Sequence, residues 1–206
     1  GYTVGEASVS GEVRELDVSW LSGSVTVELT DGDAVTLREE PQPESSDARM
    51  RWKLQDGKLT VYSQKSGLTI PTRAKQLTIG IPAGRAGKLQ KLSLDLSAAS
   101  ASLPALTLRE LELDSVSGSV TLMGGSYENL DFDSTSGDLT LTSAAVGVTL
   151  TLPENGGFSA TLDSVSGDLT VDGFAGSLHR DEFVYGQGGP AYEFDSVSGD
   201  VHIRCA

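Results

Sequence analysis

A twelve-residue repeat constrains the fold of this chain more than any other feature of its sequence. Five of its six copies hold Ser-Gly near the middle, and apolar residues alternate on both sides. Successive starts at 92, 111 and 130 give a period of 19 residues. A unit this short cannot bury its apolar face alone, so the copies must stack on one another. The copies are Leu16–Val27, Leu92–Leu103 (degenerate but in phase), Leu111–Leu122, Leu130–Leu141, Ala160–Val171 and Tyr192–Ile203.

The alternation inside one copy predicts two strands joined at a corner. Leu111 and Leu113 alternate with polar residues, whereas Val116, Val120 and Leu122 alternate on the opposite parity. We therefore expect a bend or bulge at Asp114–Ser115, with Val116 facing inward. One glycine per copy falls on this inward parity, which indicates close backbone approach or a positive φ. These glycines are Gly23, Gly118, Gly137, Gly167 and Gly199.

These patterns predict an all-β chain that forms a single-stranded parallel β-helix, or β-solenoid, of short repeated coils preceded by a β-meander. A β-sandwich is the alternative, since turns every 8–12 residues suit it as well. We expect residues 1–206 to form a single elongated domain, because no linker marks a boundary. Residues 1–91 are predicted to be a strand meander with one divergent repeat, and residues 92–206 to be the stacked coils.

The first half of the chain contains further strand signals. Residues 50–62 are predicted to form a hairpin, because Met50, Trp52 and Leu54 alternate before the turn pair Asp56-Gly57. Residues 34–39 and 76–82 are predicted strands, and residues 40–49 a polar loop.

Charge limits the choice of partner. The net charge of −14 argues against a nucleic acid, because phosphate binding requires a positive surface. Nine of the fifteen lysines and arginines lie in residues 51–100. Two interpretations remain: these bases lie beside acidic coils of the same chain, or they form a face for an anionic envelope polymer or lipid. The second would use Lys53, Lys58, Lys75 and Lys88. The single cysteine, Cys205, excludes an intrachain disulfide.

No catalytic motif is present. The sequence lacks a G-x-S-x-G elbow, H-E-x-x-H, a P-loop and C-x-x-C. The main chemical candidates are carboxylates that share one repeat position and would repel one another if stacked in a single ladder. Calcium would relieve that repulsion, but the paired glycines of calcium-binding β-rolls are missing. We expect no cofactor and no metal, and the weak calcium candidates are Asp114, Asp133, Asp163 and Asp195.

An insertion at residues 172–191 interrupts the repeats with aromatic and charged residues. Long loops of this composition often bind ligands. The alternative is that the aromatic residues cap the last coil. The binding candidates are Phe174, His179, Arg180, Phe183 and Tyr185.

The signature D-S-x-S-G-D-[LV]-[TH]-[VLI] resembles that of the bacterial "putative adhesin" family, a domain of unknown function built of β-strand repeats. The family's repeats are preceded by segments that resemble, in order, DGKLTVYS, KQLTIGIPAG and LQKLSLDLSAAS of this chain. The resemblance covers nearly the whole chain and brings no catalytic residues. It implies a location at the cell envelope or outside the cell, with a membrane anchor in the full-length protein.

The sequence therefore predicts a non-catalytic envelope protein, an adhesin-like or envelope-sensing scaffold. Its expected partner is an envelope glycan, lipid or protein. The alternatives are a carbohydrate-active enzyme of the polysaccharide lyase type and a passive structural spacer. The chain begins at Gly1 rather than Met, so we expect any export signal or anchor to lie outside residues 1–206.

Overall fold

The computed structural model is an all-β protein with one short helix, α1 (Ala83–Ala86), among the residues that it describes. It describes residues 1–67, 73–136, 138–152, 157–166, 168–187, 189–198 and 200–205. The described strands form one mixed sheet. They are β1 (Thr3–Val4), β2 (Ala7–Val9), β3 (Glu15–Thr30), β4 (Val35–Glu40), β5 (Arg51–Gln55), β6 (Lys58–Tyr62), β7 (Lys75–Pro82), β8 (Lys91–Leu103), β9 (Leu106–Ser117), β10 (Val120–Met123), β11 (Gly125–Ser136), β12 (Leu139–Leu152), β13 (Phe158–Ser166), β14 (Leu169–Asp172), β15 (Ser177–His179), β16 (Glu182–Tyr185), β17 (Ala191–Ser198) and β18 (Val201–Cys205).

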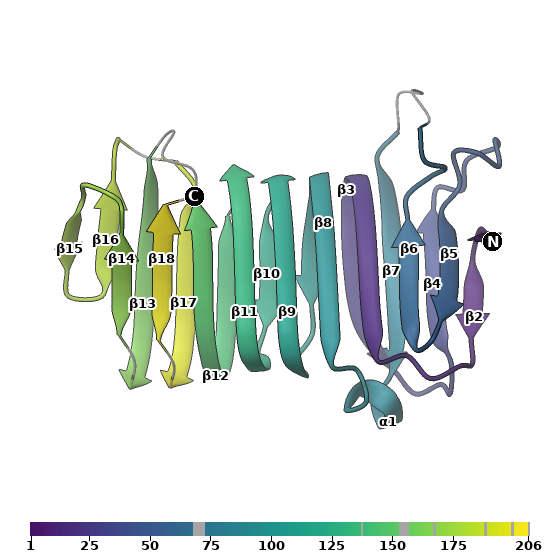
Figure 1. Cartoon of the computed structure of the whole chain (residues 1–206), viewed down its shortest axis with the longest axis horizontal. Coiled ribbons are helices and arrows are strands. Elements are labelled where there is room, and N and C mark those ends of the chain that lie inside the picture. The colour runs from purple at the N-terminus through teal and green to yellow at the C-terminus, as the bar shows by residue number, and fades with distance from the viewer. Residues whose placement is uncertain are drawn as a thin grey trace.

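The repeats stack in parallel and in register, as the 19-residue period predicts (Figure 1). Leu111 pairs with Leu92 on one side and with Leu130 on the other. The second halves follow the same register, since Val120 pairs with Ala101 and with Leu139. Parallel neighbours are what stacked coils require, whereas the sandwich alternative requires antiparallel ones.

The strands form two layers. Layer A contains, in spatial order, β5, β6, the start of β3, the start of β8, β9, β11, the end of β12, β18 and β14. Layer B contains β4, β7, the end of β3, the end of β8, β10, the start of β12, β17, β13, β16 and β15. The apolar side chains between them, mainly Leu, Val and Ile, make up the core.

The spatial order of the strands departs from the chain order at both ends. Strand β3 lies between β8 on one side and β6 and β7 on the other, and all of these pairs are parallel. The divergent repeat in residues 16–27 is therefore a full member of the stack. At the other end, β17 and β18 lie between β12 and the earlier strands β13 and β14.

The last two repeats are also turned by half a coil. The first half of the final repeat, beginning at Tyr192, pairs with Leu139 from the second half of an earlier repeat. Its second half, beginning at Val201, pairs with Val148 in layer A. The corners of these two repeats therefore lie at the opposite edge of the layers from those of the repeats at 111 and 130.

The alternation of buried and exposed side chains shifts by one residue at the glycine of the corner, and not at Asp114–Ser115 as predicted. Ser115 is buried, Val116 is 56% exposed and Val120 is buried. Gly118 has a φ of 132°, and a β-carbon there would overlap the carbonyl oxygen of Ala99 in the neighbouring coil. The close backbone approach expected at this glycine is thus present. Val116 faces solvent, because the one-residue shift in the alternation comes after Val116. Gly23 has the same environment, with a φ of 106°; Gly137, Gly167 and Gly199 lie outside the described residues.

The predicted hairpin is confirmed. Strands β5 and β6 pair antiparallel, and the turn residues Asp56 and Gly57 both have positive φ, as a type I′ hairpin turn requires. Strands β4 and β7 also form as predicted and pair with each other. No described helix is long and apolar enough to cross a membrane.

A buried ion pair lies between β4 and β7. The Nζ of Lys75 is 2.6 Å from Oε1 of Glu39, and the two side chains are 4% and 0% exposed. Lys75 also donates to the carbonyl oxygens of Ala48 and Ser63, and the Glu39 carboxylate accepts from the N–H of Met50. The interpretation that Lys75 faces an anionic partner is therefore wrong.

Candidate binding face

Outward side chains of layer A form rows that cross the strands at intervals of about 4.8 Å. On β9 and β11 the members of these rows are carboxylates. On β18 they are a histidine and an arginine. One central row begins with Glu112 and Asp131 and the other with Asp114 and Asp133, and the register of β12 places His202 in line with the first and Arg204 in line with the second.

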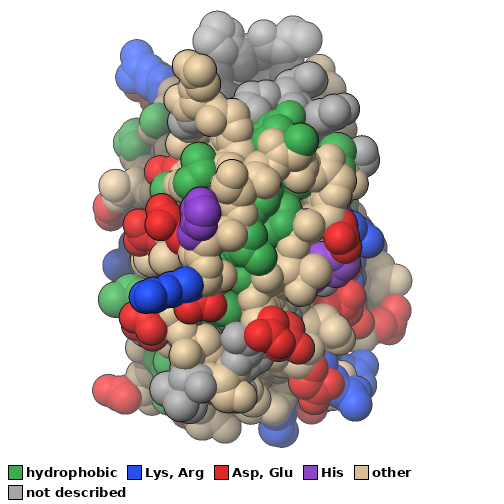
Figure 2. Space-filling view, turned by 90° about the vertical axis from the view of Figure 1, so that its left-hand side faces the viewer, with side chains coloured by type: hydrophobic (Ala, Val, Ile, Leu, Met, Phe, Trp, Pro, Cys, Tyr) green, Lys and Arg blue, Asp and Glu red, His purple; other side chains and the backbone are tan. Residues whose placement is uncertain are grey.

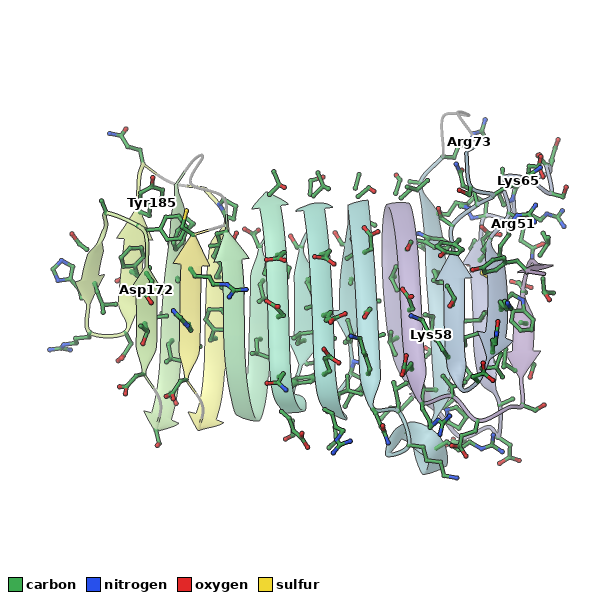
Figure 3. All side chains as sticks on the ribbon, viewed as in Figure 1. Arg51, Lys58, Lys65, Arg73, Asp172 and Tyr185 are labelled. Atoms are coloured by element: carbon green, nitrogen blue, oxygen red, sulfur yellow. The ribbon has the colours of Figure 1, made fainter. Side chains whose placement is uncertain are left out.

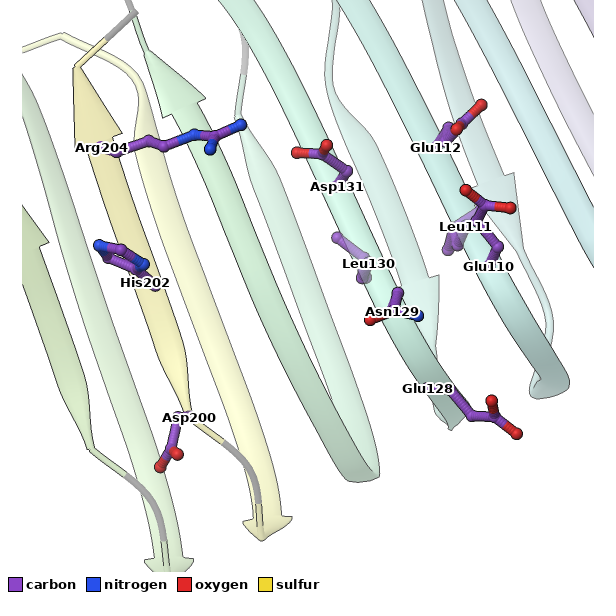
Figure 4. Close-up of a pocket in the computed structure, with 10 residues that line it drawn as sticks. All are labelled: Glu110, Leu111, Glu112, Glu128, Asn129, Leu130, Asp131, Asp200, His202 and Arg204. Atoms are coloured by element: carbon purple, nitrogen blue, oxygen red, sulfur yellow. The ribbon is translucent and has the colours of Figure 1, made fainter.

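A shallow groove of about 520 Å³ follows from this arrangement (Figure 4). Acidic side chains from β9 and β11 line one side of it, and β18 lines the other. Figure 4 shows Arg204 extending from β18 toward Asp131. The described lining residues are Glu110, Leu111, Glu112, Glu128, Asn129, Leu130, Asp131, Asp200, His202 and Arg204.

The charges on the acidic side are partly balanced. Lys91 lies 2.7 Å from Glu112 and 3.2 Å from Glu110. Hydrogen bonds from Lys91 and Ser93 hold the pKa of Glu112 below its ordinary value. Burial, followed by the charge of neighbouring Asp133, raises the pKa of Asp131, and Arg204 opposes that rise. The face therefore retains excess negative charge around one guanidinium group.

The β18 side of the groove carries donors and acceptors of its own. His202 points outward, as its alternation with Val201 and Ile203 predicted, and its Nε2 lies 2.8 Å from Oδ2 of Asp172. A polar ligand in the groove would thus meet hydrogen-bond acceptors from β9 and β11 and donors from β18.

The four calcium candidates do not form one ladder. Asp114 pairs with Asp95 and Asp133 in layer A. Asp163 pairs with Asp195 in layer B, because the last two repeats are turned by half a coil. Burial, followed by the charges of Asp133 and Asp95, raises the pKa of Asp114.

Asp138 and Asp200, which share another repeat position, accept backbone hydrogen bonds across neighbouring coils. Oδ1 of Asp138 accepts from the N–H of Ala191 at 2.8 Å, and Oδ1 of Asp200 accepts from the N–H of Asp168 at 3.0 Å. These contacts give Asp138 and Asp200 a structural role at the edges of the stack.

Calcium at millimolar concentration is expected to leave the melting temperature within about 1 °C of its value in chelator. The described His, Cys, Asp and Glu side chains form no group that would hold a metal ion. A ligand that binds the native state alone must raise its stability by mass action. Thermal melts in calcium and in chelator measure this, and a chelator-reversible rise of several degrees would contradict the expectation.

The candidate residues of the insertion separate into two groups. Phe174 and Tyr185 lie 5.0 Å apart by ring centroids, and Phe158 contacts both of them and Phe183. This cluster covers the end of the core. His179 and Arg180 are exposed at the tip of the β15–β16 hairpin.

Most basic side chains of residues 51–100 lie beside acidic groups of the same chain. Figure 3 marks Arg51, Lys58 and Lys65 among them. Lys58 is 2.8 Å from Asp17, and Arg51 and Lys65 both contact Asp47. These acids belong to the first half of the chain and not to the acidic coils of the expected arrangement, whereas Lys91 does contact Glu110 and Glu112 of the coils.

The groove residues of β9, β11 and β18 were not among the predicted site residues. Glu112 and Asp131 hold the same outward position of their repeats, but His202 holds a different position of its own repeat, and outward charges are ordinary on a solvated face. Aligning them across the face requires the spatial order of the strands, which the sequence does not state.

Comparison with known proteins gives one family and several distant structures. The model of the Toastrack DUF4097 family matches residues 13–147. A "putative cell adhesion protein" from Clostridium sporogenes is 13% identical, covers 100% of both chains and has a TM-score of 0.48. A "putative adhesin" from Bacteroides fragilis is 14% identical, covers 100% of this chain and 97% of that one, and has a TM-score of 0.42. A "putative lipid binding protein" from Parabacteroides distasonis is 12% identical, covers 100% of this chain and 96% of that one, and has a TM-score of 0.36. A search of curated proteins found no match.

Proposed function

The chain belongs to the Toastrack DUF4097 family, and from that premise we propose that it is a non-catalytic, adhesin-like β-solenoid scaffold of the bacterial cell envelope. In this proposal, layer A presents its outer face to an envelope glycan, lipid or protein. The resemblance of the S-G-D repeats to those of envelope proteins supports the envelope location, and a membrane anchor in the full-length protein is part of the same proposal.

The groove on layer A is the observation that carries this proposal. Stacking in register places carboxylates on one side and His202 and Arg204 on the other, about two strand spacings apart. A surface of this kind binds polar polymers through many weak contacts. The excess of carboxylates favours partners that offer hydroxyl, amide or ammonium groups.

We expect a groove variant to lose binding to envelope material. Glu112→Gln combined with Asp131→Asn removes two charges from the groove without changing side-chain shape. Binding should weaken about fivefold, and its dependence on salt should fall, since exposed charges contribute modestly to affinity. The measurement is co-sedimentation with purified peptidoglycan and biolayer interferometry against a panel of neutral and charged envelope polysaccharides, lipid vesicles and envelope proteins.

The control is Glu193→Gln combined with Asp195→Asn, because these two exposed acids point outward from β17 in layer B, away from the groove. The control should bind within twofold of the parent. Equal loss in both double variants would reject the groove as the site. Release of soluble fragments from any polysaccharide of the panel would instead identify an enzyme.

A further inference from the structure

The outer face of layer A carries a row of three aspartates that folding brings together. Asp114 pairs with Asp95 on β8 and with Asp133 on β11 in parallel register, so the three carboxylates follow one another at intervals of about 4.8 Å. In the sequence, each member stands one 19-residue period from the next. The repulsion between these charges is therefore created by folding, since the unfolded chain keeps them far apart. We call these three residues the acid row.

Acidic side chains beside the acid row add to the repulsion. Glu112 and Asp131 stand two residues before Asp114 and Asp133, on the same outward face of their strands. Partial burial raises the pKa of Asp114 above its ordinary value, and the charges of the four neighbouring carboxylates raise it further. Asp114 therefore holds a proton more tightly in the folded chain than in the unfolded chain.

The cations of this face do not neutralise the acid row. Lys91 contacts Glu110 and Glu112 in the adjacent rows. The register of β12 places Arg204 in line with the acid row, but two strands beyond its end. At the other end the next residue in line is the uncharged Ser19 of β3, and the core beneath the row is apolar. Among the residues that the structure describes, no member of the acid row forms an ion pair.

We infer that the acid row is a pH-sensitive element, which makes the stack more stable in mildly acidic solution than at neutral pH. Protonation of Asp114 removes the central charge of the row, and with it the repulsion toward Asp95 and Asp133. The destabilisation is complete above the raised pKa of Asp114 in the folded chain, and it disappears as the pH falls from there to the ordinary value. This effect is a property of the folded chain and requires no ligand in the groove.

Two other features of the chain also respond to acid. Carboxylates lie on both outer faces, as Figure 2 shows in a view along the stack from the β15 end, and the net charge of −14 makes them repel one another. His202 lies 2.8 Å from Asp172, and histidines ordinarily gain a proton between about pH 8 and pH 5. Both effects are present alike in the parent and in variants that keep these residues, so a comparison between variants isolates the acid row.

The test compares the melting temperatures of Asp114→Asn and the parent in low salt, where charges are least screened. At about pH 7.5, Asp114→Asn should melt about 3 °C above the parent, because it removes the central charge without changing side-chain shape. At about pH 4.5 this gain should fall by at least half, since the parent then binds the proton itself. Asp33→Asn is the matched control, because Asp33 is an exposed acid in the loop between β3 and β4. It removes the same net charge and should stay within about 1 °C of the parent at both pH values.

A second measurement does not depend on any variant. Carbon-13 NMR titration of the side-chain carboxyl groups of the parent should give Asp114 a pKa above that of an aspartate in a short peptide. Three outcomes would overturn the inference: a pKa of Asp114 at or below the peptide value, no gain in the melting temperature of Asp114→Asn at about pH 7.5, or the same change in Asp114→Asn and Asp33→Asn at both pH values.

Discussion

Replacing Lys75 by Met is expected to lower the free energy of unfolding by about 3–5 kcal/mol, because it leaves the carboxylate of Glu39 buried without its cation. The side chain of Glu39 is 0% exposed, and its charge cannot turn toward water. Lys75 also lies 5.1 Å from the ring centroid of Trp20, whose Nε1 donates to the Lys75 carbonyl oxygen at 3.0 Å. The loss of stability should appear in thermal melts as a fall of about 10 °C in the melting temperature.

Two controls separate the buried charge from other effects of the change. Lys58→Met breaks the ion pair with Asp17, where both side chains are partly exposed, and should cost no more than about 1 kcal/mol. Lys75→Met combined with Glu39→Met removes both charges, and should recover part of the stability lost by Lys75→Met alone. If Lys75→Met and Lys58→Met have the same melting temperature, the ion pair between β4 and β7 does not stabilise this end of the stack.

Repetition and local turn chemistry made much of the fold predictable. Residues aligned by sequence alone pair in the structure among the repeats at 16, 92, 111 and 130, as Leu16 does with Leu92, and again between the repeats at 160 and 192. The hairpin at Asp56-Gly57 was predictable for a similar reason, since positive φ at both positions is a local requirement. In each case the information lies within a few residues of the chain.

The order of the coils was not predictable in this way. Every repeat presents the same alternation and the same strand length, so any copy can stack on any other. No residue pattern in the last repeat indicates that its two strands lie between earlier strands of the chain. Strand β17 pairs with β12 on one side and with β13 on the other, although β13 and β14 precede it in the sequence. The half-coil turn of the last two repeats was not predictable for the same reason, the similarity of the repeats. Because of this turn, the expected ladder of Asp114, Asp133, Asp163 and Asp195 is divided between the two layers.

The buried ion pair did leave a trace in the sequence. Glu39 continues the inward parity of Val35 and Leu37, and Lys75 begins the inward parity of Leu77 and Ile79. Glu39 lies on an inward position of the predicted strand 34–39, and Lys75 directly precedes the predicted strand 76–82 on its inward parity, so the two opposite charges indicate a buried pair. The groove of layer A lacked such a signal, because outward charges are ordinary on a solvated face.

Gly118→Val is expected to destabilise the chain by about 4 kcal/mol, since it adds strain to overpacking. The backbone at Gly118 has a φ of 132°, which a β-branched residue rarely adopts. Its β-carbon would also overlap the backbone of Ala99, which cannot move aside because the N–H of Ala101 is bonded to the carbonyl of Ser119. Thermal and urea melts should show the loss, and Gly23→Val should behave alike because Gly23 lies against the backbone of Lys75.

The overlap begins at the β-carbon, so the size of the new side chain matters little. Gly118→Ala should therefore lose most of what Gly118→Val loses. Ser119→Val makes a similar change at the next residue, which is exposed, and should cost less than about 1 kcal/mol. The contrary result would be that Gly118→Ala has the melting temperature of the parent and only Gly118→Val is unstable. The corner would then have room for a β-carbon, and the neighbouring coils would be less closely stacked than the surroundings of Gly118 and Gly23 indicate.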